Sequence, residues 1–135
     1  MNEENRRLNA QAEIEASAEA MSAAEALTAA GLLRSAVSRL YYAMFHLVRA
    51  LVMSHGFDPR THEGVETLFG LHFVRTRTVD VRFGKVFAHL QRFRQQADYG
   101  PLLALSSEDV IRDIATVREF SGEVRRILGI DDAPA

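Results

Sequence analysis

The feature of this 135-residue chain that most restricts its fold is an apolar seam within residues 32–54. Apolar side chains recur there at alternating steps of four and three residues. This spacing places them on one face of an α-helix, as in the helices of an antiparallel bundle. The seam therefore predicts a long core helix. It consists of Leu33, Val37, Leu40, Met44, Leu47 and Leu51.

Three more long helices and one short helix are predicted on either side of this seam. Residues 3–30 are rich in Ala and Glu and contain neither Pro nor Gly, which favours a helix. Shorter periodic patterns predict a helix at about 62–74, one at about 79–99 and one that ends near 128. The core residues expected outside the seam are Leu8, Ile14, Ala18, Met21, Leu27, Val86, Leu90, Phe93, Val110, Ile114, Val117, Phe120, Val124 and Ile127 or Leu128.

Residues with strong terminal preferences mark the ends of these helices. Gly31 and Gly56 are expected terminators, and Gly100-Pro101 is a typical helix stop. Thr61 is the expected N-cap of the short helix, and Ser106 or Ser107 that of the last one. Ser106 and Asp109 also have the spacing of a capping box, and residues 129–135 form an expected frayed tail. The sequence thus predicts one all-α domain over residues 1–135, an antiparallel up-and-down bundle of four long helices plus one short helix.

Composition excludes several kinds of chemistry. The chain has no cysteine, which rules out disulfides, thiolate zinc sites, iron–sulfur clusters and a cysteine nucleophile. It has no tryptophan and 8% aromatic residues, which argues against a broad base-stacking platform. No apolar run is long enough to span a membrane, and the polar start is unlike a signal peptide. We therefore expect a cytoplasmic protein without a membrane partner.

Positive charge is concentrated in the middle of the chain. Residues 31–105 carry ten cations against five anions, whereas both flanking segments are acidic. Fifteen of the sixteen cations are Arg, which suits bidentate binding of phosphate. This distribution is compatible with an RNA or nucleotide partner and equally with a solvated basic surface.

A second stripe follows the core helix on the side away from the seam. It contains Arg39, Tyr42, His46, Arg49 and Met53, and the arc between stripe and seam is filled by Tyr41, Phe45, Val48 and Val52. A helix that is apolar over more than half of its circumference does not face solvent on its remaining side. The polar stripe is therefore expected to line a groove or a partner interface.

Arg39 and His46 are the candidate catalytic residues. They lie two helical turns apart on nearly the same azimuth, roughly 10.5 Å along the axis. Arg supplies a permanent cation for a phosphodiester, and neutral His can accept the proton of a ribose 2′-hydroxyl. The structural alternative is a His that forms a hydrogen bond within the bundle beside an Arg paired with a carboxylate of another helix.

Three motifs resemble the small stand-alone prokaryotic members of the HEPN superfamily (higher eukaryotes and prokaryotes nucleotide-binding). They occur in the order and at the kind of spacing found in that family, and the resemblance covers about residues 10–128. The motifs are Ser38-Arg39-Leu40-Tyr41-Tyr42-Ala43-Met44-Phe45-His46, Gly56-Phe57-Asp58-Pro59-Arg60-Thr61-His62-Glu63-Gly64-Val65 and Arg94-Gln95-Gln96-Ala97-Asp98-Tyr99-Gly100.

The resemblance implies a helical bundle that forms a homodimer, with an Arg-x4–6-His motif lining a cleft. Arg39 and His46 match this motif. It also implies a metal-independent endoribonuclease toxin, often encoded beside a minimal nucleotidyltransferase antitoxin that in some systems modifies a tyrosine, here Tyr42 or Tyr99. One position departs from the pattern, because active members tend to have a polar residue after the Arg and this chain has Leu40.

Further candidate residues come from the other two motifs. With Tyr42 and Arg49, the loop residues Arg60 and His62 are expected to bind substrate, although Thr61 and Pro59 have simple capping and turn-forming explanations. Arg94 and Asp98 either pair along their own helix or support the cleft by orienting Arg39 or His46. Tyr99 is expected to pack at the helix end. These three residues, Arg94, Asp98 and Tyr99, form the predicted supporting set.

No metal or cofactor is expected. His55, His72 and His89 show neither His-x-x-x-His nor Glu-x-x-His spacing. Three function classes remain open: a metal-independent ribonuclease, a non-catalytic nucleotide- or RNA-binding subunit of a nucleotidyltransferase complex, and a structural dimerisation bundle.

Overall fold

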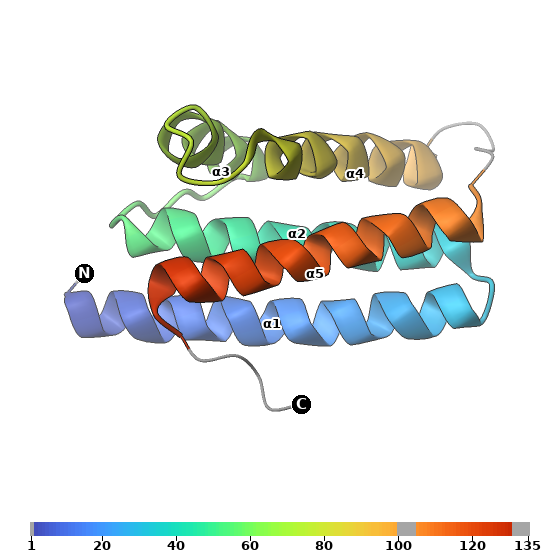
Figure 1. The fold of residues 1–135 in the computed structure, drawn as a ribbon, viewed down its shortest axis with the longest axis horizontal. Helices are drawn as coiled ribbons and strands as arrows, with labels where there is room; N and C mark the ends of the chain where they lie inside the picture. The colour runs from blue at the N-terminus through green and yellow to red at the C-terminus, as the bar shows by residue number, and fades with distance from the viewer. Residues whose placement is uncertain (1, 100–104, 131–135) are drawn as a thin grey trace.

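Four long helices run up and down beside one another in the computed structural model of this chain (Figure 1). The structure describes residues 2–99 and 105–130, with the backbone alone for residues 96–99. Within these residues all regular structure is helical, which confirms the predicted fold class. The elements are α1 (Glu3–Ala29), α2 (Leu33–Ser54), α3 (His62–Phe69), the π-helical turn η1 (Gly70–Val74), α4 (Val81–Tyr99) and α5 (Ser107–Leu128).

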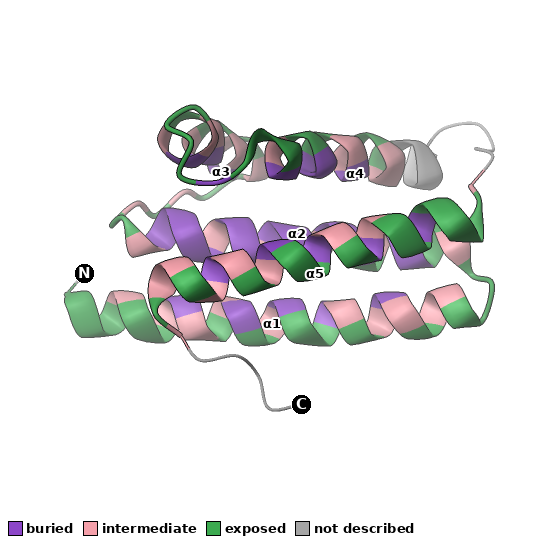
Figure 2. Cartoon of the chain, in the orientation of Figure 1, coloured by how far each residue is buried: buried purple, intermediate pink, exposed green. Residues whose placement is uncertain are grey.

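Helix α2 is the centre of the bundle and packs against α1, α3, α4 and α5. Figure 2 shows it buried along most of its length. Five of the six seam residues are buried, and Leu33, at the helix start, is half-buried. Each fully buried side chain of this size contributes about 1.5–3 kcal/mol relative to an exposed one. The predicted seam is thus confirmed as the core face of α2.

Helix α1 buries the expected face only in part, with Met21 and Leu27 half-buried against the core. Of the predicted core residues Ile14 is buried, but Leu8 is 56% exposed and Ala18 is exposed. The buried positions carry mostly small side chains: Ala10, Ile14, Ser17, Ala20 and Ala24. The buried Ser17 hydroxyl donates a hydrogen bond to the Ala43 carbonyl of α2 at 2.7 Å. The prediction was wrong for Leu8 because close approach of two helices favours small residues, and for Ala18 because the buried positions of α1 include Ser17 instead.

The predicted caps at the ends of the helices are present. Gly56 follows α2 with φ 89°, a left-handed conformation that glycine adopts without strain. Thr61 Oγ1 accepts a hydrogen bond from the Gly64 amide, and Ser106 Oγ accepts one from the Asp109 amide. At the C-terminal end of α5, Gly129 is left-handed and the Ile130 amide donates a hydrogen bond to the Arg125 carbonyl. Residues 129 and 130, two positions expected to fray, therefore cap the helix.

The short helix differs from the prediction in its last turn. Residues 62–69 are α-helical, but residues 70–74 form a π-helical turn in which the Arg75 amide donates to the Gly70 carbonyl. Such turns insert a residue into the helix without ending it, and the 3.6-residue pattern does not reveal them. Helix α4 begins at Val81, two residues later than predicted. The Gly100-Pro101 stop and the tail at 131–135 lie outside the described residues.

Candidate functional site

A carboxylate from α1 binds two side chains of the polar stripe on α2. Glu13 Oε2 lies 2.6 Å from His46 Nδ1, and Glu13 Oε1 lies 3.0 Å from an Arg49 guanidinium nitrogen. The Glu13 side chain is 13% exposed and those of His46 and Arg49 are 27% and 33% exposed, so the carboxylate is shielded while its two partners still reach solvent. Residues 46 and 49 are three apart on one helix, which places both on the side facing α1. We call these three residues the Glu13 cluster.

The Glu13 cluster determines which nitrogen of His46 carries hydrogen. An ionised carboxylate only accepts hydrogen bonds, so His46 Nδ1 must donate to Glu13. In the neutral ring, Nε2 then has a free lone pair. A histidine oriented by a carboxylate in this way is suited to accept a proton from a substrate hydroxyl.

Arg39 and Tyr42 lie on the same side of α2, toward its N-terminal end. The Arg39 guanidinium is exposed and lies 5.1 Å from the centre of the Tyr42 ring. Within the described residues Arg39 forms no ion pair. Tyr42 is half-buried between the positions of Arg39 and His46. Met53, by contrast, is buried, so the polar stripe ends at Arg49.

His62 approaches the same region from the start of α3. Its Nδ1 atom lies 2.9 Å from the hydroxyl of Tyr41, and its ring stacks on Phe45 with centroids 4.2 Å apart. Burial, together with the nearby charges of Arg94 and Arg49, holds the pKa of His62 below its usual range. Burial also raises the pKa of Tyr41 to about 12, so its hydroxyl keeps its proton.

Three of the four predicted substrate-binding residues line one hollow. Arg49, Arg60 and His62 surround a space of about 380 Å³ between α2 and the loop before α3. Arg60 is exposed and lies 4.0 Å from the Asp58 carboxylate, a contact too long and too wet to contribute much stability. Two cations and a histidine around an open hollow are suited to bind a phosphate group.

Of the predicted supporting set, Arg94 is the one whose side chain is described. Its guanidinium lies 4.9 Å from the Tyr41 ring centre and 5.5 Å from that of Tyr42. It therefore supports the two tyrosines from α4 through cation–π contacts. The side chains of Asp98 and Tyr99 lie outside the described residues.

Glu13 is the member of the site that the sequence did not identify. It is one of several glutamates in the Ala- and Glu-rich first helix, and only its position next to the buried Ile14 distinguishes it. His46 thus forms a hydrogen bond within the bundle, as the structural alternative in the sequence analysis expects. The Arg paired with the carboxylate is Arg49, however, and not Arg39.

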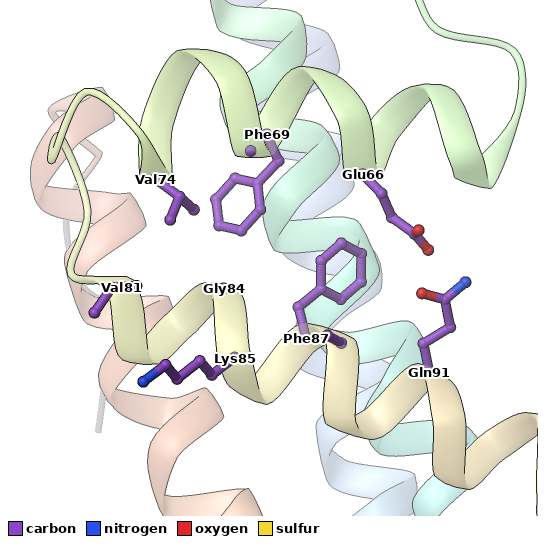
Figure 3. Close-up of a pocket in the computed structure, with 10 residues that line it drawn as sticks. Glu66, Phe69, Val74, Val81, Gly84, Lys85, Phe87 and Gln91 are labelled. Carbon is purple, nitrogen blue, oxygen red and sulfur yellow. The ribbon is translucent and has the colours of Figure 1, made fainter.

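A second hollow lies between α3, η1 and α4 (Figure 3). Its volume is about 350 Å³, and Phe69, Val74 and Phe87 give it a mainly apolar lining. Glu66 and Gln91 face each other at one end. Glu66 Oε1 is buried and has no hydrogen-bond partner in the described part of the chain. Burial and the neighbouring Glu63 raise the pKa of Glu66.

Among the side chains described, those of residues 2–95 and 105–130, no three His, Asp or Glu gather closely enough to hold a metal ion. No helix in these ranges has the length and apolar character needed to cross a membrane.

Comparison with known proteins identifies similar chains. Residues 10–127 match the family model described as the HEPN domain. A UPF0332 protein of Thermotoga maritima is 33% identical over 96 residues, which is 71% of this chain and 73% of that protein. A UPF0332 protein of Pyrococcus horikoshii is 46% identical over 59 residues, 44% of this chain and 42% of the relative.

A third relative has a name that refers to function. The Methanocaldococcus jannaschii protein named "Putative toxin MJ0142" is 35% identical over 74 residues, 55% of this chain and 50% of that protein. The match to the Pyrococcus and Methanocaldococcus proteins thus spans half of their length or less.

Proposed function

This chain belongs to the HEPN domain family, and from that premise we propose that it is a metal-independent endoribonuclease. We further propose that it is the toxin of a toxin–antitoxin pair whose other member is a minimal nucleotidyltransferase. The toxin role is supported by the name of the Methanocaldococcus relative. The ribonuclease role is supported above all by the Glu13 cluster, which orients His46 beside cationic side chains.

Cleavage would begin with removal of the proton from a ribose 2′-hydroxyl by His46 Nε2. The 2′-oxygen attacks the phosphorus, a P–O2′ bond forms and the P–O5′ bond breaks, which yields a 2′,3′-cyclic phosphate. The departing 5′-oxygen takes a proton from water, and the hydroxide that remains takes the proton from His46, which restores the neutral imidazole. Glu13 stabilises the imidazolium that forms on His46 at 2.6 Å.

Arginines would hold the phosphate during this step. Arg39 makes no ion pair within the described residues, so its charge is available to a phosphodiester. Arg49 uses one side of its guanidinium for Glu13 and lines the hollow that contains Arg60 and His62. A planar cation that is already positioned stabilises the charge that develops on the phosphate oxygens.

The proposed partners are RNA, a second copy of the chain and the nucleotidyltransferase, all in the cytoplasm. Tyr42 is the proposed acceptor of a nucleotidyl group among the described tyrosines near Arg39. Its ring is half-buried, whereas Tyr41 is fully buried and hydrogen-bonded to His62. Sedimentation equilibrium would test the homodimer, and a monomeric mass at micromolar concentration would contradict it.

The decisive experiment is cleavage of total RNA in EDTA by the wild type and by His46→Ala. His89→Ala is the matched control, because His89 forms a comparable pair with Asp113 across α4 and α5 at 3.1 Å. We expect the wild type and His89→Ala to cleave in the chelator. The cleavage rate of His46→Ala should be about 10²–10⁴-fold lower, the usual contribution of a positioned acid–base group.

Binding measured in parallel separates the other two function classes. The full burial of Leu40 in the seam favours a non-catalytic RNA- or nucleotide-binding subunit as the second candidate, since the residue after Arg39 does not face the site. Binding without cleavage would support that role. Neither binding nor cleavage would support a structural dimerisation bundle.

A further inference from the structure

We infer that His62 is a neutral hydrogen-bond donor to a non-bridging oxygen of the scissile phosphate, oriented for this by Tyr41. The inference rests on the proposed ribonuclease function and adds a second histidine to it. His62 would keep its proton throughout, whereas His46 would accept one.

The hydrogen bond between Tyr41 and His62 indicates where the His62 proton lies. Tyr41 is fully buried, and within the described residues its hydroxyl has one hydrogen-bond partner, His62 Nδ1 at 2.9 Å. If His62 donated to this oxygen, the hydroxyl proton would be buried without an acceptor, which costs about 1–3 kcal/mol. The hydroxyl therefore donates to Nδ1, and His62 carries its hydrogen on Nε2.

Two stacking contacts hold the His62 ring in this orientation, and a cap fixes the start of its helix. The ring stacks on Phe45 at 4.2 Å with an angle of 20° between the planes, and on Tyr41 at 6.0 Å. Thr61 caps the helix that begins at His62. Because Nδ1 is used by Tyr41, Nε2 lies on the other side of the ring, and His62 lines the hollow that contains Arg49 and Arg60.

The surrounding groups keep His62 uncharged. Burial is the main cause of its lowered pKa, and the positive charges of Arg94 and Arg49 and the neighbouring His46 act in the same direction. The Glu66 carboxylate on α3 acts electrostatically on Tyr41 and helps to raise its pKa. A neutral imidazole with a fixed N–H group can stabilise charge on oxygen without competing with His46 for the proton.

The two histidines thus have opposite hydrogen-bonding polarity. His46 donates from Nδ1 to Glu13 and has a free lone pair on Nε2, whereas His62 accepts at Nδ1 and has its hydrogen on Nε2. Arg49 connects them, because it binds Glu13 and lines the hollow of His62. Asp58 also lines the hollow, with its carboxylate 4.0 Å from Arg60. A phosphate there would meet two cations, one directional neutral donor and this carboxylate.

The kinetic test compares wild type, His62→Ala and His62→Gln on a short RNA with a single phosphorothioate of defined stereochemistry. Sulfur accepts hydrogen bonds poorly, so the wild type should cleave one diastereomer more slowly. On the all-oxygen RNA, the cleavage rate of His62→Ala should be about 10²–10³-fold lower, as found when one hydrogen-bond donor to a developing oxyanion is removed. The variant should also cleave the two diastereomers at equal rates. His62→Gln keeps an N–H donor and should recover part of both.

The pH–rate profile distinguishes this role from proton transfer. The limb of the profile that reports His46 should persist in His62→Ala, and the wild type should show no further limb that the variant loses, because a neutral donor does not titrate in the reaction. Loss of a limb would overturn the inference by making His62 a general acid or base. An equal rate loss on oxygen and sulfur substrates, with a lowered melting temperature, would also overturn it by showing a structural role.

A second measurement does not require catalysis, so failure of the proposed function remains distinguishable. Nitrogen-15 NMR of histidine-labelled protein should show His62 protonated on Nε2 and His46 on Nδ1, and Tyr41→Phe should abolish the preference at His62. Addition of a 2′-deoxy dinucleotide, which cannot be cleaved, should shift the His62 Nε2 resonance. The opposite tautomer, or no shift at saturation, would overturn the inference even if the wild type cleaves RNA.

Discussion

Two half-buried carboxylates, Glu13 on α1 and Glu66 on α3, have opposite surroundings. Both oxygens of Glu13 are bound, one by His46 and one by Arg49. Glu66 faces an apolar hollow, its Oε1 atom has no hydrogen bond within the described residues, and burial raises its pKa. The same side-chain chemistry therefore supports a charged cluster in one place and resists ionisation in the other.

The difference shows that burial alone does not mark a functional carboxylate. A shielded charge is stable when partners satisfy its oxygens, and it is costly when they do not. At Glu13 the partners come from the central helix α2. Glu66 lies at one end of a hollow with a mainly apolar lining, and Gln91 faces it there (Figure 3). The four predictions that follow test this contrast.

The largest effect is expected from Glu13→Ala. The change removes the group that orients His46 and holds Arg49, so kcat for RNA cleavage should fall by about 10²-fold or more. Glu13→Gln keeps an oxygen that accepts a hydrogen bond from His46 Nδ1, so its kcat should lie between those of Glu13→Ala and the wild type. Single-turnover kinetics would measure both. Glu15→Ala, an exposed position on the same helix, is the matched control and should be unchanged.

Removal of the α3 cap should affect both regions. Thr61→Ala deletes the hydroxyl that accepts from the Gly64 amide, so the free energy of unfolding should fall by about 1 kcal/mol. Cleavage should also slow, because α3 begins at His62. Thr67→Ala, at an exposed interior position of α3, is the control. Urea denaturation of the three proteins gives the comparison, and equal midpoints would refute the role of the cap.

Glu66→Gln should change the pH dependence of stability. The folded-state pKa of Glu66 is raised, so the folded protein binds more protons than the unfolded chain between the two pKa values. Wild-type stability therefore falls as pH rises through this window. Glu66→Gln should flatten the fall and add less than about 1 kcal/mol at neutral pH, since the side chain is partly solvated. Melting curves of both proteins from pH 4 to 8 would measure this. A variant that loses stability as steeply as the wild type would contradict the prediction.

Arg60→Ala should have the smallest effect. Its contact with Asp58 is long and exposed, so the free energy of unfolding should change by less than about 0.5 kcal/mol. RNA affinity should fall severalfold at low salt and by less at high salt, because the lost interaction is with phosphate. Fluorescence anisotropy at two salt concentrations would test this. A fall that does not depend on salt would argue against a phosphate contact.

Sequence patterns were sufficient for the helices and most of their ends. The seam on α2 and the caps at Thr61 and Ser106 depend on residues within a few positions of one another. The π-helical turn at 70–74 was missed because its hydrogen bond, from Arg75 to Gly70, leaves no trace in a 3.6-residue pattern. The buried face of α1 was misassigned in part because close helix contact selects small residues.

The candidate site was only partly predictable. Arg39, His46 and Arg49 share one side of α2, and that placement follows from helical geometry. Arg60 and His62 were identified from their loop motif, and the structure brings them to the same hollow as Arg49. Glu13 and the tyrosine partner of His62 could not be identified in this way.

What the sequence by itself determined is the set of helices, their caps and the polar stripe on the central one, because these depend on local spacing. Only the tertiary structure decided that Glu13 meets His46 and that Tyr41 meets His62, pairs separated by 33 and 21 residues. Such contacts depend on the rotation and axial offset of one helix against another. A shift of one residue turns a side chain by about 100°, enough to remove Glu13 from His46.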